Sequence, residues 1–286
     1  MSRKPQVQLF YNPASGSYSD SALARLVAAF RQEGAEVTTA ACADRPPAVD
    51  DCATHICIAG GDGTIRHVAA MLVESGCALP VAIYPVGTVN LLAREAGVKP
   101  DPGALARNLL HGRAERHHHP ASLGGSMFFA CASIGPDSVA VAGVSPALKA
   151  RIGRLAYAAT FLRLLWDWPR TRLTLGANGD LVRCEAVYVA KGRHYAGPWS
   201  FAPGARVGDQ RLHVLALRRA RRRDYLRFLC LLLLRRDPAR DRNAIAFTCR
   251  ELSISSEKPM PIQADGDIVA SSPAEMRVDP RSITFC

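Results

Sequence analysis

The sequence lacks the features of several classes of protein. Its longest uninterrupted apolar run, at 228–234, is far shorter than the ~20 residues that a membrane-spanning helix requires. The first residues contain no apolar stretch of the kind found in signal peptides. There is no low-complexity segment and no internal repeat, and an apolar content of 48% excludes a disordered chain. We therefore expect a globular protein of the cytoplasm.

None of the nine cysteines belongs to a C-x-x-C pair. This spacing disfavours a zinc site and a disulfide framework, and it is typical of reduced thiols in a cytosolic protein. The 286 residues correspond to about two domains of roughly 150 residues each. We expect each domain to be held together by its own apolar core.

Positive charge is present in excess, with 36 Lys and Arg against 25 Asp and Glu. The segment 218–242 holds ten arginines and three aspartates around a leucine-rich block. Such a segment is typical either of a core helix with solvated ends or of a basic amphipathic helix attracted to anionic lipid, and the two readings are compatible. We expect Arg218–Arg242 to offer a docking surface for a membrane. Nucleic acid is not expected as a partner, because no nucleic-acid-binding motif accompanies the charge.

Strand-like and helix-like segments alternate over residues 1–115. Apolar runs predict strands at 7–11, 36–40, 55–59 and 79–84. Amphipathic segments predict helices at 22–33, 64–75, 89–96 and 104–110. Strand, loop and helix repeated in this way predict a doubly wound, mostly parallel α/β domain.

The pattern becomes β-rich from about residue 116. Helices are predicted between 136 and 167, with a split near Gly153. Strands are predicted at 127–134, 172–175, 184–190, 212–217, 244–255 and 262–268. An Asn178-Gly179 turn between two of these runs indicates a hairpin. We expect a second, largely antiparallel domain over 116–277, and a last strand within 278–286 that returns to the first domain.

Two glycine-bearing loops follow expected parallel strands, and each opens a helix. The first loop is Gly60-Gly61-Asp62-Gly63-Thr64 and the second is 85–90, which contains Gly87, Thr88 and Asn90. Ligands bind at this edge of open α/β sheets, where glycines allow close approach and helix N-termini attract phosphate. Asp62 suits a bound Mg²⁺ or a hydroxyl donor. Asn12 follows the first strand at the same edge. Neither loop matches the P-loop or the dinucleotide fingerprint.

Together these residues resemble the diacylglycerol kinase catalytic-domain family, which includes bacterial lipid kinases and sphingosine and ceramide kinases. The resemblance covers nearly the whole chain in order. Its motifs are Asn12-Pro13 with Ser15-Gly16, GGDGT at 60–64, PVGTVNLLARE at 85–95, ASIG at 132–135 followed by Asp137, GRLAY at 153–157, APGA at 202–205 and QADGD at 263–267.

The resemblance implies a two-domain kinase that binds ATP at the α/β domain, with a β-sandwich domain forming the other wall of the active-site cleft. It assigns the lipid-activating base to Asp267, with Asp265 beside it and Asp62 on the phosphate side. Because alternate residues of a strand share a face, Asp265 and Asp267 are expected to point the same way. It also implies a Mg²⁺ in the second domain, held by Asp209 and the carbonyls of Arg206 and Arg211. The phosphate contacts it implies are Asn12, Thr39, Gly60, Gly61, Asp62, Gly63, Thr64, Gly87, Thr88 and Asn90.

Several residues depart from the family pattern. Arg66 and His67 stand where many members have Asn-Glu, Gln210 follows Asp209 in place of glycine, and Asp267 is one methylene shorter than the common glutamate. We expect an ATP-dependent lipid kinase that acts on diacylglycerol or a related lipid alcohol. The alternatives are an NAD kinase-like activity and a non-catalytic lipid- or nucleotide-binding protein. A homo-oligomer remains open.

Overall fold

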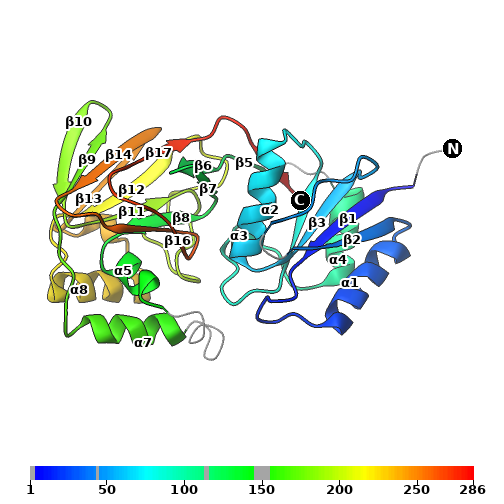
Figure 1. The fold of residues 1–286 in the computed structure, drawn as a ribbon, viewed down its shortest axis with the longest axis horizontal. Helices are drawn as coiled ribbons and strands as arrows, with labels where there is room; N and C mark the ends of the chain where they lie inside the picture. Colours follow the sequence, from blue (N-terminus) through cyan, green and yellow to red (C-terminus); the bar gives the residue numbers. More distant parts are fainter. Residues whose placement is uncertain (1–3, 43–44, 113–115, 145–154) are drawn as a thin grey trace. The chain divides into compact units, whose positions relative to one another are not determined.

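The computed structural model describes residues 4–42, 45–112, 116–144 and 155–286. The chain forms two compact units, each with its own apolar core (Figure 1). Unit 1 comprises Met1–His118 and Arg281–Cys286, and unit 2 comprises His119–Pro280. The C-terminal residues therefore belong to the same unit as the N-terminal ones.

Unit 1 contains a six-stranded sheet in the order β2-β1-β3-β4-β18-β5. The strands from β2 to β18 pair in parallel, and β5 pairs antiparallel with β18. Their bounds are β1 Gln6–Tyr11, β2 Glu36–Ala41, β3 His55–Gly60, β4 Val81–Pro85, β5 Arg116–His118 and β18 Ile283–Phe285. β3 and β4 are direct neighbours, with Gly60 opposite Pro85, so the loops that follow them leave the sheet at the same edge.

Helices cover both faces of this sheet (Figure 1). Ser19 caps α1 by accepting a hydrogen bond from the backbone N–H of Ala22, and Asp101 caps α4 in the same way. α1 and α4 share a core with β1, β3 and β4, whereas Figure 1 shows α2 on the opposite face. The helices are α1 Asp20–Gln32, α2 Asp62–Glu74, α3 Leu91–Glu95 and α4 Pro102–His111.

Unit 2 contains two antiparallel sheets of six strands each. One has the order β10-β9-β14-β17-β6-β7, and the other has the order β13-β12-β11-β8-β15-β16. The first comprises β6 Ala121–Leu123, β7 Ser126–Phe128, β9 Leu173–Ala177, β10 Asp180–Cys184, β14 Glu251–Ser256 and β17 Ala274–Val278. The second comprises β8 Cys131–Ile134, β11 Ala186–Ala190, β12 Leu212–Leu217, β13 Ala244–Cys249, β15 Pro261–Ala264 and β16 Asp267–Ser271.

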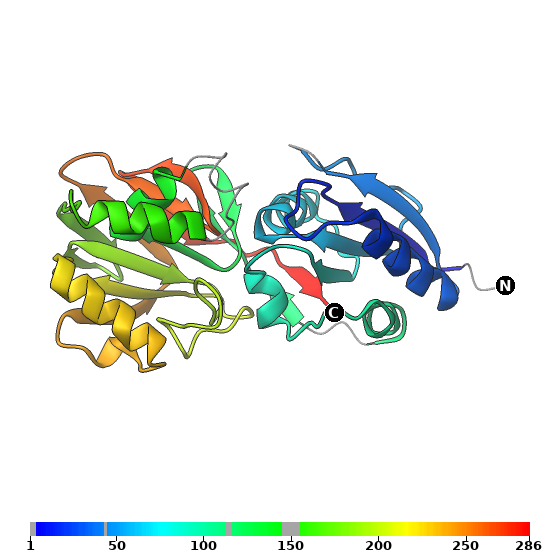
Figure 2. The same cartoon turned by 90° about the horizontal axis from the view of Figure 1, so that it is seen from below.

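The two sheets of unit 2 enclose one core, to which Leu175 and Met276 contribute from one sheet and Val187 and Val214 from the other. The outer face of the second sheet carries helices, which Figure 2 shows from below. Tyr188 of β11 points to that face and lies 4.7 Å from the ring of Phe228. β11 is therefore buried on both sides. The helices are α5 Pro136–Ala142, α7 Leu155–Leu164, α8 Arg222–Leu233 and the 3-10 turn Pro238–Arg240.

The structure confirms the predicted fold class, with parallel pairing dominant in the N-terminal sheet and antiparallel sheets in the C-terminal part. The hairpin predicted at Asn178-Gly179 joins β9 to β10. Three predicted strands were too long, because each is two strands: 127–134 is β7 and β8, 244–255 is β13 and β14, and 262–268 is β15 and β16. The helix break predicted near Gly153 lies outside the described residues.

In the described part of the chain, every helix is too short or too polar to cross a lipid bilayer.

Candidate functional site

The two glycine loops of unit 1 touch each other. A Cβ on Gly87 would lie 2.4 Å from the Cα of Gly61, which no real side chain tolerates. The backbone N–H of Val86 donates to the carbonyl of Gly60 at 3.0 Å. Glycine at both positions therefore allows the loops after β3 and β4 to meet, as the sequence predicted for one sheet edge.

Asn12 and Thr64 lie against the first loop. The side-chain amide of Asn12 donates to the Thr64 hydroxyl at 3.0 Å, and its oxygen accepts from the N–H of Ala14. A Cβ on Gly60 would lie 2.6 Å from the Cβ of Thr64, so this glycine makes room for the threonine. The loop after β1 thus joins the site, and Asn12 and Thr64 hold its shape with their own polar groups.

The N-terminus of α2 provides backbone donors at this edge. Gly61 is the N-cap and has no side chain to accept from the first turn, which begins at Asp62 and Gly63. The N–H groups of a helix's first turn point toward this end, and the helix dipole favours an anion there. The arrangement is therefore suited to a phosphate group.

The Asp62 carboxylate connects the first loop to the helix that follows the second. Its Oδ1 accepts a hydrogen bond from the N–H of Leu91, the first residue of α3, at 2.6 Å. One oxygen of Asp62 is thereby engaged in fixing the two loops relative to each other.

The second loop is closed by the side chain of Asn90. This residue has the left-handed φ of 55° and is the N-cap of α3. Its oxygen accepts from the N–H of Gly87 at 2.9 Å, and its amide donates to the Gly87 carbonyl at 2.7 Å. Asn90 therefore shapes the loop, whereas Thr88 is exposed beside it, with Gly16 of the loop after β1 close to its hydroxyl.

Thr39 is the remaining residue predicted to contact the nucleotide. It lies within the edge strand β2, opposite Leu9 of β1. It lines a hollow with residues of α1 that include Asp20 and Arg31. The nucleotide contact of Thr39 that the resemblance implies stays a prediction.

The late acidic motif is a turn and not a continuous strand. Asp265 and Gly266 have φ values of 49° and 92° and join β15 to β16, with Ala264 paired to Asp267. Two successive positive φ values are typical of a two-residue hairpin turn. The prediction that Asp265 and Asp267 share a strand face was therefore wrong, because strand alternation does not apply across the turn.

The contacts of Asp265 also correct its predicted role beside the base. Its carboxylate is buried and accepts hydrogen bonds from three successive backbone N–H groups, those of Phe129 at 2.7 Å, Ala130 at 2.9 Å and Cys131 at 3.0 Å. The carboxylate thus anchors the hairpin to the segment between β7 and β8. Asp267, half-buried at the start of β16, follows this anchored turn.

The residues expected to hold a metal in unit 2 do not fit that role as they are arranged. The ammonium of Lys191 donates to the carbonyl oxygens of Asp209 and Arg211, the latter at 3.2 Å. The Arg206 carbonyl accepts from the N–H of Asp209 at 3.0 Å. The Asp209 carboxylate accepts from the N–H of Arg206 and lies 2.8 Å from Nε2 of His213. Of the two carbonyls expected to bind a metal, that of Arg211 is thus taken by the Lys191 ammonium and that of Arg206 by a backbone N–H.

Lys191 was not among the site residues predicted from the sequence. It is fully buried and directly follows β11. Burial lowers the pKa of its amine to about 8, and the charge of Asp209 opposes that shift. A single lysine in a long chain has no local motif that could have identified it.

A buried polar cluster in unit 2 was also not predicted as a unit. The Asp137 carboxylate accepts from the hydroxyls of Ser133 and Tyr195, the latter at 2.9 Å, and Gln263 donates to Ser133 at 2.7 Å. The cluster connects α5, β8 and β15, so it fixes the strand that precedes the acidic hairpin.

Comparison with known proteins gives two family matches. Residues 6–119 match the diacylglycerol kinase catalytic domain, and residues 130–286 match the YegS C-terminal NAD kinase beta sandwich-like domain. A diacylglycerol kinase of Bacillus subtilis is 25% identical over 280 residues, which cover 94% of this chain and 92% of the relative.

A probable lipid kinase, YegS-like, of Pseudomonas fluorescens is 32% identical over 166 residues, and this match covers 57% of the chain and 55% of the relative. The fold also matches the crystal structure of a diacylglycerol kinase from Bacillus anthracis, with a TM-score of 0.73 and 15% identity over 100% of this chain and 97% of that one.

Proposed function

We propose that this chain, which belongs to the diacylglycerol kinase catalytic-domain family, transfers the γ-phosphate of ATP to the hydroxyl of diacylglycerol or a related lipid alcohol. Its C-terminal domain is of the YegS type, and the chain is a kinase. The observation that carries the proposal is the contact between Gly61 and Gly87, which joins two phosphate-type loops into one site. Phosphoryl transfer depends mainly on positioning and on neutralising charge, and a site of this kind supplies both.

In the proposed site, backbone donors of the first turn of α2 bind the phosphate tail of the nucleotide. Asp62 connects the first loop to α3 through its hydrogen bond from Leu91, and Asn90 shapes the second loop through its hydrogen bonds to Gly87. A Mg²⁺ bound with ATP would neutralise phosphate charge, and the oxygens of Asp62 and Thr88 are the donor type that this ion prefers.

The proposal assigns the general base to Asp267. Its carboxylate accepts the proton of the lipid hydroxyl as that oxygen bonds to the γ-phosphorus, and the bond to the β-phosphate oxygen breaks to release ADP. Asp265 is a positioning residue, because its three backbone hydrogen bonds fix the turn that precedes Asp267.

The test is transfer of labelled phosphate from ATP, with Mg²⁺ present, into a total lipid extract and in parallel into NAD. We expect label in a phosphatidate-like lipid and none in NADP. Label in NADP alone would replace the proposal with an NAD kinase-like activity. Saturable ATP binding without transfer to either acceptor would favour a non-catalytic binding protein.

A further inference from the structure

The outer surface of α7 and α8 exposes large apolar side chains. α8 buries Tyr225, Phe228 and Leu232 against unit 2, as a core helix should. Its opposite side nevertheless carries exposed leucines, and so does α7, which lies beside it in Figures 1 and 2. The exposed apolar residues, here called the apolar ridge, are Leu162, Trp166, Leu226, Leu233 and Leu234.

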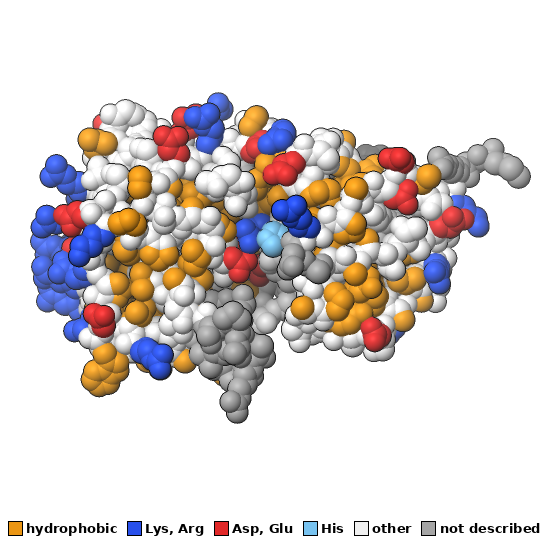
Figure 3. Space-filling view, viewed as in Figure 1, with side chains coloured by type: hydrophobic (Ala, Val, Ile, Leu, Met, Phe, Trp, Pro, Cys, Tyr) orange, Lys and Arg blue, Asp and Glu red, His pale blue; other side chains and the backbone are white. Residues whose placement is uncertain are grey.

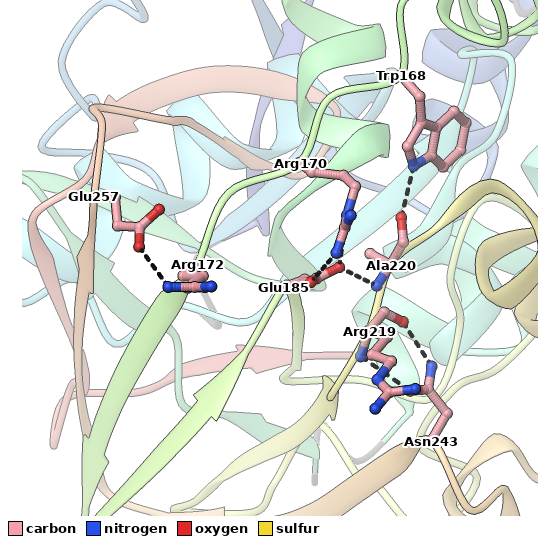
Figure 4. Close-up of polar contacts among 8 residues, drawn as sticks. All are labelled: Trp168, Arg170, Arg172, Glu185, Arg219, Ala220, Asn243 and Glu257. Carbon is pink, nitrogen blue, oxygen red and sulfur yellow. Dashed lines mark hydrogen bonds and ion pairs between the residues drawn. The ribbon is translucent and has the colours of Figure 1, made fainter.

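Trp166 is the most exposed member of the ridge, at 88% of its surface. Arg222 of α8 donates to the Trp166 carbonyl at 3.0 Å. Two residues later, the indole of Trp168 donates to the carbonyl of Ala220 at 2.6 Å (Figure 4). Its ring also packs 5.4 Å from the ring of Tyr225. These hydrogen bonds attach the segment that carries Trp166 to α8 and to the residues just before it.

An ion pair reinforces this connection. Glu185, just before β11, accepts from the guanidinium of Arg170 at 2.5 Å and from the N–H of Ala220 at 2.8 Å (Figure 4). The segment after α7 and the segment before α8 are thereby fixed to the same carboxylate. Glu185 thus links the ends of the two helical segments that expose the apolar ridge.

Arginines are abundant in the segment that contains α8. The segment 218–242 contains ten arginines and three aspartates, and Figure 3 shows Lys and Arg side chains gathered where Figure 1 draws α8. Arg227 pairs with Asp241 at 2.5 Å, and Arg223 lies 3.8 Å from Asp224. The aspartates leave seven arginines in excess, so the ridge is set in a strongly positive surface.

We propose that the α7–α8 surface docks onto an anionic lipid bilayer, with Trp166, Leu233 and Leu234 entering the headgroup region while the arginines bind lipid phosphates. Tryptophan prefers this interface because its ring is apolar and its N–H is polar. At a bilayer surface the leucines can contact acyl chains while the arginines contact lipid phosphates. A nucleic acid would bind the arginines but would offer the leucines no apolar partner. The inference rests on the proposed function in one respect: docking would give the enzyme access to its lipid substrate.

The test is co-sedimentation of the full chain, without ATP, with vesicles of phosphatidylglycerol and phosphatidylcholine. The double variant Trp166→Ser, Leu233→Ser should bind about tenfold more weakly. The double variant Arg235→Gln, Arg236→Gln should bind roughly thirtyfold more weakly. The matched controls are Leu181→Ser, at a leucine that is 77% exposed on β10, and Arg183→Gln on the same strand. Both controls should bind like the wild type.

Wild-type chain that stays in the supernatant would overturn the docking proposal. Equal loss in the ridge variant and in the Leu181→Ser control would overturn it as well. Loss with the arginine variant alone would indicate binding of polyanions by charge only and would also contradict the proposal. Because the sedimentation assay contains no ATP, it tests docking alone. Vesicle binding in this assay, together with no transfer of label to lipid in the ATP assay above, would refute the proposed function and leave docking intact.

A second, independent observation concerns Lys191. Its ammonium donates to the carbonyls of Asp209 and Arg211, two of the residues at which the family resemblance implies a Mg²⁺. We infer that Lys191 takes the place of the metal as the fixed cation of this loop. An ammonium group offers three donors and one positive charge, so it can bind the carbonyls that a metal ion would otherwise coordinate.

Thermal unfolding of the full chain without nucleotide, in EDTA and in excess MgCl₂, tests this inference. The wild-type midpoint should be the same in both solutions, and Lys191→Met should lower it by roughly 5 °C, because two carbonyls lose the donor that a buried lysine supplies. The exposed Lys258→Met is the matched control and should leave the midpoint unchanged. A wild-type midpoint that MgCl₂ raises, with the rise abolished in Asp209→Asn, would overturn the inference. A Lys191→Met midpoint equal to that of the wild type would overturn it too.

Discussion

The carboxylate of Asp62 accepts a hydrogen bond from the backbone N–H of Leu91 at 2.6 Å. The two residues are 29 positions apart, and each begins a helix that follows one of the two glycine loops. An acidic side chain thus stabilises two helix N-termini at once, its own and that of α3. The bond keeps the loops together before any ligand is bound.

Gly87→Ala should separate the loops, because its Cβ would lie 2.4 Å from the Cα of Gly61. We expect kcat/KM for ATP to fall roughly a hundredfold, since a displacement of about 1 Å at a reacting group has that effect. Steady-state kinetics check this. The control is Gly204→Ala, where an added Cβ meets nothing within 4 Å. Equal kinetics for the two variants would show that contact between the loops is not needed.

Asp265→Ala should destabilise unit 2, because three buried N–H groups would lose their acceptor. We expect a loss of about 3 kcal/mol in the free energy of unfolding, measured by urea denaturation. Asp180→Ala is the control, since this exposed aspartate follows another two-residue hairpin turn and should change stability by less than about 0.5 kcal/mol. If Asp265→Ala lowered the free energy of unfolding by a similarly small amount, its role as the anchor of the hairpin would be contradicted.

Asp137 should make stability depend on pH. Burial raises the pKa of its carboxyl above the ordinary 3.8, and the hydrogen bonds from Ser133 and Tyr195 act in the opposite direction. The folded chain therefore holds this proton more tightly than the unfolded chain does. The stabilisation is present at acid pH and is lost as pH rises through the folded-state pKa.

Asp137→Asn cannot ionise, so its unfolding free energy should decline less than that of the wild type as pH is raised from about 4 to neutrality. Urea denaturation across this range measures the difference. Asp51→Asn, on an exposed loop, should keep the slope of the wild type. Parallel curves for Asp137→Asn and the wild type would contradict the assigned pKa shift.

Local sequence signals were sufficient for the glycine loops. Gly61 and Gly87 each stand between a strand and a helix, and parallel neighbours bring such positions to one edge. The roles of Asp62 and Asn90 could not be predicted, because each depends on a hydrogen bond that only the folded loops define.

The acidic hairpin shows a signal that was present in the sequence and not used. Asp265-Gly266 has the composition of a tight turn, as has Asn178-Gly179, which was correctly predicted as a hairpin. Lys191 gave no such signal. Its partners are carbonyl groups of residues 18 and 20 positions away. Every residue has a backbone carbonyl, so the residue types at those positions do not reveal the contact.

The central claim, that Asp267 is the base of a lipid kinase, is tested most directly by the single-turnover rate of phosphate transfer to diacylglycerol in Asp267→Asn and in Asp180→Asn. Both aspartates follow a two-residue turn at the start of a strand, so the substitutions are closely matched. We predict a loss of about 10²- to 10⁴-fold for Asp267→Asn and a wild-type rate for Asp180→Asn. A wild-type rate for Asp267→Asn, with the chain folded, would contradict the account.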